Sequence, residues 1–218
     1  MPGEKAFLFD LNGTMINDMD FHIKAWYGIL NGLGANISME RMKEECYGKN
    51  DELLERIFPE RFTEEQKSRM SYDKVTAYQH AFRPSLKLIN GLDIFLEKTF
   101  HAGIPMAIGS AAIMYNIDFV LDGLNIRHYF KSIVSAEGVQ KSKPDPQTYI
   151  KCAKQLDVPF KNCIVFEDAP KGVEAAQNAG MQCVVITTMH NMEEFGAYKN
   201  ILCFINDYID TKLDNLFD

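Results

Sequence analysis

Short apolar runs alternate with amphipathic stretches along most of this chain. The runs have the length of β-strands and are almost continuously apolar, as in parallel strands that helices cover on both faces. The pattern predicts strands at Ala6–Leu11, Pro105–Gly109, Ser132–Ser135, Cys163–Glu167, Cys183–Ile186 and Ile201–Phe204. Between the last five of these it predicts helices at Ile113–Leu124, Asp145–Leu156, Lys171–Ala179 and Met192–Tyr198. This alternation indicates an α/β fold with a doubly wound parallel sheet.

The block from about Met19 to Phe82 breaks the alternation, because it contains helical patterns and no convincing strand. Apolar residues recur there at helical spacing, and Thr63–Gln66 has the pattern of a capping box that opens a helix. We therefore predict a Rossmann-like core of residues 1–15 and 87–218 with an inserted small α-helical domain of residues 16–86. The linkers are expected near Met15–Asp18 and Arg83–Asn90.

Composition excludes some classes of protein. The formal net charge of the 218 residues is -7, which argues against a phosphate backbone as the main partner. No apolar run approaches the roughly 20 residues of a membrane span, and Met1–Lys5 begins no signal-peptide pattern. The five cysteines lie far apart and form no metal-binding spacing. We expect a cytoplasmic monomer that binds neither nucleic acid nor membrane.

Four groups of polar residues follow predicted strands at their carboxyl ends, where open α/β sheets bind ligands. They are Asp10–Thr14, Gly109–Ala111, Lys143 at a helix start, and Glu167-Asp168. Taken singly, each is a weak signal, because an Asp after a strand is often a loop cap. Together they supply a carboxylate nucleophile, acidic ligands for a hard cation such as Mg²⁺, and a hydroxyl and an ammonium for phosphoryl oxygens. The combination predicts phosphoryl transfer through a covalent intermediate.

These motifs resemble the haloacid dehalogenase (HAD) superfamily, and within it the β-phosphoglucomutase-like phosphatases and phosphohexomutases with a helical cap. The resemblance extends from Ala6 to about Phe204. It rests on Phe-Asp-Leu-Asn-Gly-Thr from Phe9, on Ser110, on Ser-Lys-Pro-Asp-Pro from Ser142, and on Phe166–Ala176. It implies that Asp10 is the nucleophile and forms an aspartyl-phosphate. It also implies Mg²⁺ ligands at Asp10, the backbone carbonyl of Asn12, Glu167 and Asp168, with the phosphoryl group held by Ser110 and Lys143.

The resemblance also suggests where a substrate would bind. In the predicted cap, His22 and Trp26 have the spacing of the mutase branch, and Lys49 lies in a similar loop. Purely structural roles stay open for these three residues. His22 can be a linker residue, Trp26 a core residue of the cap and Lys49 a solvated cation. In the core, the Ala111 backbone and Asn116 are further candidates for substrate contact.

The chain departs from the family at Asn12, where the general acid/base is normally Asp. An amide cannot exchange a proton, so help of about 10²–10⁴-fold should be lost there. Three explanations stay open. The leaving group needs little protonation; His22, Asp18 or Asp20 supplies the proton; or the chain is an engineered or inactive variant. A dehalogenase also lacks that Asp, but the acidic pair Glu167-Asp168 favours phosphoryl transfer.

The predicted cap differs from that of the mutases, which carry Lys and Arg where Tyr47 and Asp51 stand. That Arg holds the distal phosphate of a bisphosphate, a bidentate task that Asp cannot perform. The sequence therefore predicts a Mg²⁺-dependent HAD-type phosphatase for a small phosphorylated metabolite such as a sugar monophosphate. The alternatives are a β-phosphoglucomutase-type phosphohexomutase and a catalytically impaired HAD-fold binding protein.

Overall fold

The computed structural model describes residues 5–217. The chain forms two compact units, one of Met1–Asn17 with Lys87–Asp218 and the other of Asp18–Leu86. Residues 1–4 and 218, which belong to the predicted core, lie outside the described residues. That the second unit acts as a cap for the first stays a prediction.

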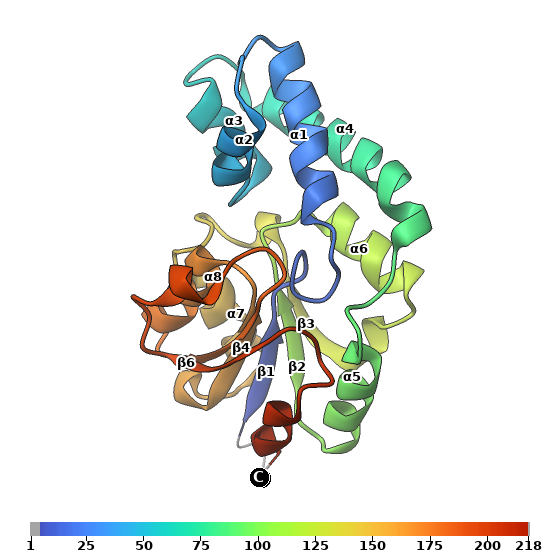
Figure 1. Cartoon of the computed structure of the whole chain (residues 1–218), viewed down its shortest axis with the longest axis vertical. Coiled ribbons are helices and arrows are strands. Elements are labelled where there is room, and N and C mark those ends of the chain that lie inside the picture. The colour runs from blue at the N-terminus through green and yellow to red at the C-terminus, as the bar shows by residue number, and fades with distance from the viewer. Residues whose placement is uncertain (1–4, 218) are drawn as a thin grey trace. The chain divides into compact units, whose positions relative to one another are not determined.

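The first unit is built on a six-stranded parallel sheet (Figure 1). Its strands are β1 (Ala6–Phe9), β2 (Met106–Gly109), β3 (Phe130–Val134), β4 (Cys163–Glu167), β5 (Gln182–Ile186) and β6 (Ile201–Ile205). They lie in the order β3-β2-β1-β4-β5-β6, and every pair of neighbours is parallel. The direction of winding therefore reverses between β1 and β4, and ligands bind at such a point in open α/β sheets.

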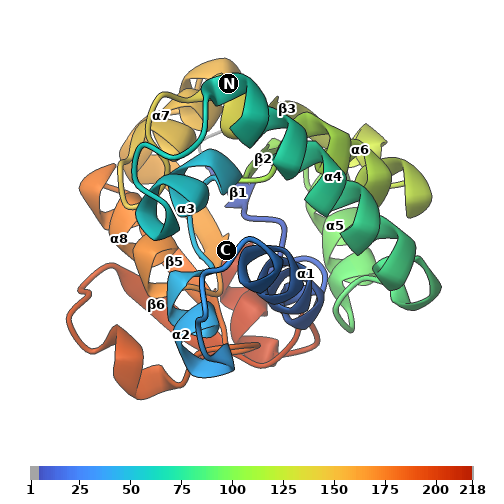
Figure 2. The ribbon, with the colours of Figure 1, turned by 90° about the horizontal axis from the view of Figure 1, so that it is seen from above.

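Helices cover both faces of this sheet. The long ones are α5 (Leu92–His101), α6 (Met114–Gly123), α7 (Gln147–Leu156) and α8 (Pro170–Asn178). Figure 2 shows α5 and α6 on one side of the strands and α7 and α8 on the other. Short 3₁₀ helices lie between the strands and helices, at Arg127–Tyr129, Ala136–Gly138, Phe160–Asn162 and Met192–Phe195, and a last one follows β6 at Thr211–Leu216. This doubly wound arrangement confirms the predicted fold class.

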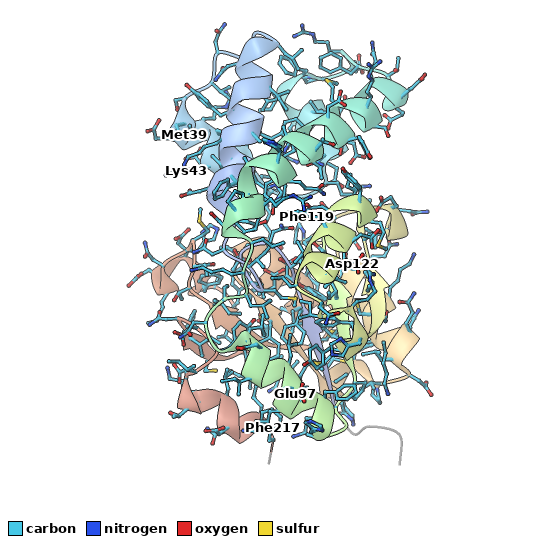
Figure 3. The ribbon with its side chains drawn as sticks, turned by 90° about the vertical axis from the view of Figure 1, so that its right-hand side faces the viewer. Met39, Lys43, Glu97, Phe119, Asp122 and Phe217 are labelled. Atoms are coloured by element: carbon cyan, nitrogen blue, oxygen red, sulfur yellow. The ribbon has the colours of Figure 1, made fainter. Side chains whose placement is uncertain are left out.

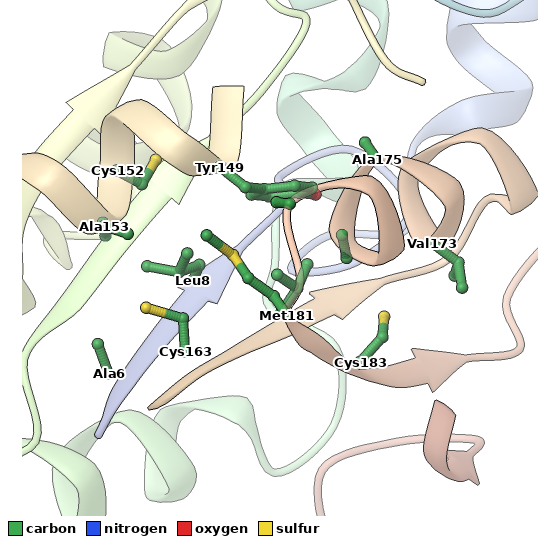
Figure 4. Close-up of a cluster of buried hydrophobic side chains, with 14 of the residues drawn as sticks. Ala6, Leu8, Tyr149, Cys152, Ala153, Cys163, Val173, Ala175, Met181 and Cys183 are labelled. Carbon is green, nitrogen blue, oxygen red and sulfur yellow. The ribbon is translucent and has the colours of Figure 1, made fainter. Parts of the chain in front are cut away.

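Side-chain alternation along the strands separates two cores. Phe7 and Phe166 face α5, where their rings contact Phe95, and Phe217, labelled in Figure 3, joins this aromatic cluster. The alternate residues of the strands pack in a second cluster with side chains of α7 and α8 (Figure 4). Because side chains alternate with a period of two, Asp10 and Glu167 continue the rows on the α7 and α8 face.

The second unit consists of α1 (Met19–Gly32), α2 (Met39–Glu45), α3 (Asn50–Ile57) and α4 (Glu64–Phe82), followed by a 3₁₀ turn at Arg83–Ser85. The capping box that the sequence predicts is present, since the Thr63 side chain accepts from the N–H of Gln66 and the Gln66 side chain accepts from the N–H of Thr63. Met39 and Lys43, labelled in Figure 3, lie one turn apart on the short helix α2.

Several predicted bounds were wrong. The strand from Ala6 ends at Phe9 and not at Leu11, because the chain turns there and the N–H of Met15 donates to the carbonyl of Leu11 at 2.9 Å. The predicted helix at Met192–Tyr198 is a 3₁₀ turn of Met192–Phe195. Helix α5 was not predicted, and α2 lies in the predicted helical block without having been identified there as a separate helix. In residues 5–217, no helix combines the length and the apolar character of a membrane span.

Candidate active site

The carboxyl ends of β1 and β4 bring three acidic side chains together. Asp10 follows β1, Glu167 ends β4 and Asp168 follows it. One carboxylate oxygen from each lies within 4.8 Å of the others, and all three residues are buried. The backbone extends the strand pairing at this point, since the N–H of Asp10 donates to the carbonyl of Phe166 at 3.0 Å. The register of two neighbouring strands thus builds the cluster.

Lys143 reaches this cluster from the loop that precedes α7. Its ammonium group donates to Asp10 Oδ1 at 2.5 Å and to Glu167 Oε1 at 2.6 Å. The ammonium is itself buried, so two carboxylates replace the water that it loses. Burial alone would lower the pKa of Lys143, but Asp10 and Glu167 raise it above its ordinary value. Lys143 is therefore a fixed positive charge.

The three carboxylates repel one another despite this ammonium. Burial raises the pKa of Asp10 to about 7, with Lys143 acting against the shift and Glu167 adding to it. The pKa of Asp168 is raised well above its ordinary value by burial and by the charges of Glu167 and Asp10. A divalent cation reverses such shifts, and oxygen ligands are those that Mg²⁺ prefers. The donor set therefore fits a hard cation.

Further hydrogen bonds orient Glu167 at the end of β4 and Asp168 after it. The Thr14 hydroxyl donates to Asp168 Oδ1 at 3.1 Å. The N–H groups of Asp168 and Ala169 donate to Glu167 Oε2 at 3.0 and 3.2 Å. These bonds use the Thr of the Asp10–Thr14 motif and the first turn after β4. Both acids are thus held in defined orientations.

Two glycines leave the space that these acids occupy. A Cβ at Gly172 would lie 1.8 Å from Glu167 Oε1, and one at Gly13, where φ is +82°, would lie 2.1 Å from Asp168 Oδ2. We expect Gly172→Ala to displace the Glu167 carboxylate and weaken Mg²⁺ binding by about 10–100-fold, measured by isothermal titration calorimetry.

Gly28→Ala is the matched control for Gly172→Ala, because in the described part of the chain no atom outside the backbone of α1 lies within 4 Å of its Cβ position. It should leave Mg²⁺ binding unchanged and stabilise the chain by up to about 1 kcal/mol. If Gly172→Ala is folded and binds Mg²⁺ like the unmodified chain, Glu167 does not belong to the cation site.

The remaining predicted residues of the first unit lie around the ends of β1 and β2. The Ser110 hydroxyl is buried and accepts from the N–H of Ala112 at 3.1 Å. Ala111 is half-buried in the same loop. Asn12 pairs through its backbone with Ile16 in an isolated bridge. Asn116, in the first turn of α6, is 1% exposed, and its amide oxygen and nitrogen have no hydrogen-bond partner among residues 5–217.

His22 of the second unit belongs to a buried polar network. Its Nε2 lies 3.1 Å from Asp18 Oδ2, and its Nδ1 lies 2.5 Å from the ammonium of Lys74. The Tyr78 hydroxyl also donates to Asp18, and its ring stacks on the imidazole. An ammonium can only donate, so Nδ1 must accept and Nε2 must carry the proton. Both ring nitrogens are thus engaged within this unit.

We expect His22 to be a neutral imidazole with its proton on Nε2 at pH 7. The ¹⁵N chemical shifts of the imidazole ring measure this protonation state. Burial and the Lys74 charge lower its pKa, and burial also lowers the pKa of Lys74, to about 8. In the unfolded chain His22 binds a proton below a pH of about 6.5, whereas burial keeps it neutral in the folded chain. The folded state is therefore fully stable above that pH with respect to His22, and it loses stability as the pH falls below it.

The variant Lys74→Met tests how the Lys74 charge affects the protonation of His22. Without the ammonium, the pKa of His22 should rise. An imidazolium at pH 7 in the unmodified chain, or a proton on Nδ1, would contradict the assignment.

Trp26 and Lys49 also belong to the second unit. Trp26 is buried, and the Lys74 ammonium lies 5.5 Å from its ring centroid. Lys49 precedes α3. Its backbone N–H donates to Glu52 Oε2 at 3.1 Å, and its ammonium lies 3.7 Å from Asp51 Oδ2. Their predicted roles in substrate binding stay predictions.

The sequence analysis missed several residues of this site. Thr14 lies inside a quoted motif, and the spacing of Gly172 after Glu167 gave no sign of its contact. The hydroxyl of Tyr149 donates to Glu167 Oε1 at 2.7 Å. Tyr149 was missed because it occupies an apolar position of its predicted helix. A buried aromatic residue with a polar end, six positions after Lys143, is the signal that was available.

Comparison with known proteins places the chain in a family. The model of the haloacid dehalogenase-like hydrolases matches residues 7–186. Fructose-1-phosphate phosphatase YqaB of Escherichia coli is 29% identical over 82% of this chain and 94% of its own length. β-Phosphoglucomutase of Bacillus subtilis is 30% identical over 83% of this chain and 82% of its own length.

The fold of the chain also matches a solved structure of a HAD hydrolase. The HAD hydrolase of family IA, variant 3, from Entamoeba histolytica superposes with a TM-score of 0.86 at 26% identity, over 98% of both chains. The fold and the family match now agree with the motifs at the strand ends. The chain belongs to the haloacid dehalogenase-like hydrolase family.

Proposed function

We propose that this chain is a Mg²⁺-dependent phosphatase that acts on a small phosphorylated metabolite, such as a sugar monophosphate, through an aspartyl-phosphate at Asp10. One observation carries the proposal: Asp10, Glu167 and Asp168 converge at the winding reversal of the sheet, with Lys143 bonded to two of them. The phosphatase and mutase names of the relatives support the same class of reaction.

In the proposed mechanism, a carboxylate oxygen of Asp10 attacks phosphorus and the bond to the leaving oxygen breaks. Lys143 and Ser110 bind the phosphoryl oxygens, and the charge of Lys143 also lowers the pKa of Asp10, which favours the ionised nucleophile. Water then attacks phosphorus, releases inorganic phosphate and restores the Asp10 carboxylate. The nucleophile thus splits one difficult displacement into two easier ones.

Asp10, Glu167, Asp168 and the backbone carbonyl of Asn12 would hold the cation. When bound, Mg²⁺ neutralises the charge that the phosphoryl group and the acids bring together. Glu167 and Asp168 are already oriented by backbone and hydroxyl donors, so little reorganisation is needed.

Asn12 marks where this site differs from its family. Its amide can hydrogen-bond the leaving oxygen but cannot give it a proton. His22 is a weak substitute as donor, because both of its ring nitrogens are engaged by Asp18 and Lys74. We therefore propose that the substrate has a leaving group that needs little protonation, such as an anomeric phosphate.

A substrate panel tests the proposal. Purified protein with Mg²⁺ is offered anomeric sugar phosphates, sugar phosphates esterified at a primary hydroxyl, pyrophosphate and an aryl phosphate. Phosphate release, fastest from the anomeric and aryl compounds, is expected, and it should stop when a chelator removes the cation. Conversion of β-glucose 1-phosphate into glucose 6-phosphate without net phosphate release would instead favour the phosphohexomutase, which the B. subtilis relative supports. No turnover of any compound would contradict the proposal.

A further inference from the structure

Tyr149 touches two groups of the site, although the mechanism above does not use it. Its hydroxyl donates to Glu167 Oε1 at 2.7 Å. The Lys143 ammonium lies 4.7 Å from the centroid of its ring. The side chain is fully buried, at 0% exposed. A buried tyrosine thus presents its polar end to one charged group and its ring to another.

Tyr149 can reach this position because strand β2 ends in a glycine, which has no side chain. A Cβ at Gly109, the last residue of β2, would lie 3.2 Å from Tyr149 Cε1 and 3.0 Å from Thr148 Cγ2. Because glycine stands there, the first turn of α7 packs closely against the strand. Figure 4 shows the Tyr149 ring over β1, with its hydroxyl end directed toward α8.

The hydroxyl completes the hydrogen bonding of Glu167. Oε1 accepts from Lys143 and Tyr149, while Oε2 accepts from the N–H groups of Asp168 and Ala169. Four donors on one carboxylate fix both its rotamer and its plane. Without the hydroxyl, Oε1 would accept from Lys143 alone.

The ring limits where the Lys143 ammonium can lie. A lysine ends in a point charge on a flexible four-carbon stem, so its position depends on what surrounds it. Here Asp10 and Glu167 accept from it, and the face of an aromatic ring attracts a cation at this range. These three groups together define one place for the charge.

We propose that Tyr149 is a positioning residue of this site, with two separable roles. The hydroxyl orients Glu167 for the cation, and the ring holds the Lys143 ammonium where a phosphoryl group is bound. The roles attributed to Glu167 and Lys143 rest on the proposed function, but the positions of the two groups can be measured without turnover.

Two substitutions separate the roles. Tyr149→Phe keeps the ring and removes the hydroxyl, while Tyr149→Leu removes both. We expect Tyr149→Phe to weaken Mg²⁺ binding by about 10-fold or more, with inorganic phosphate affinity in saturating Mg²⁺ close to that of the unmodified chain. Tyr149→Leu should weaken both by about 10-fold or more. Isothermal titration calorimetry measures each affinity.

Proton NMR of the Lys143 side chain supplies a readout that simple loss of stability would not move. Protons above a ring face are shifted upfield, so the shift should persist in Tyr149→Phe and vanish in Tyr149→Leu. Tyr198→Phe is the matched control, since Tyr198 packs against the same buried cluster, and its affinities should not change.

Unchanged Mg²⁺ affinity in folded Tyr149→Phe would overturn the role of the hydroxyl, even if Tyr149→Leu does not fold. A Lys143 side chain without an upfield shift in the unmodified chain would overturn the role of the ring. If the binding results agree with expectation but no phosphate ester is turned over, the proposed function fails and the positioning role stands.

Discussion

Asp10→Asn should lower phosphate release by at least about 10⁴-fold, the scale seen when a nucleophile is removed from an enzyme. The amide has nearly the shape of the carboxylate but is a far weaker nucleophile. It also removes one charge from a buried cluster in which Lys143 pairs with Asp10 and Glu167. Steady-state assays with the best compound of the substrate panel measure the loss.

Folding must be separated from chemistry in this variant. Replacing one of three mutually repelling acids by a neutral group need not destabilise the chain, because the burial of Asp10 already raises its pKa to about 7. The thermal unfolding midpoint should therefore stay close to that of the unmodified chain. Phosphate release that survives in folded Asp10→Asn would show that another group is the nucleophile.

Asn12→Asp should raise turnover by about 10²–10⁴-fold, the usual contribution of a general acid/base. The new carboxyl group can protonate the leaving oxygen and later take a proton from the attacking water. The backbone of residue 12, which pairs with Ile16, should be unaffected by the change. In kcat/KM, which reports the step that forms the aspartyl-phosphate, the gain should be largest for poor leaving groups, such as esters of a primary hydroxyl, and smallest for aryl phosphates.

Asn12→Ala is the matched control for this gain. It removes the amide without adding a proton donor, so its turnover should stay within about 10-fold of the unmodified chain, since one hydrogen bond is lost. Equal rates for Asn12→Asp and the unmodified chain, across poor and good leaving groups, would mean that another group already supplies the proton.

The sheet was legible from the sequence because its strands are buried on both faces and read as continuous apolar runs. The strand ends then located Asp10, Ser110 and Glu167 at one edge. Helix α5 escaped notice because Ile94 and Phe100 are 68% and 50% exposed, so its apolar residues do not mark one face. The tertiary partners were beyond reach for another reason. Contacts such as Tyr78 with Asp18 join residues far apart in the chain, and no local pattern encodes them.

The covalent step is the central claim, and acid quenching during turnover tests it most directly. Asn12 leaves the second step without its usual base, so the phosphorylated form should accumulate. Mass spectrometry of the quenched protein should find one phosphoryl group on the peptide that contains Asp10, absent from Asp10→Asn. Steady phosphate release with an unmodified Asp10 at every quench time, or with the phosphoryl group on a different residue, would contradict the account.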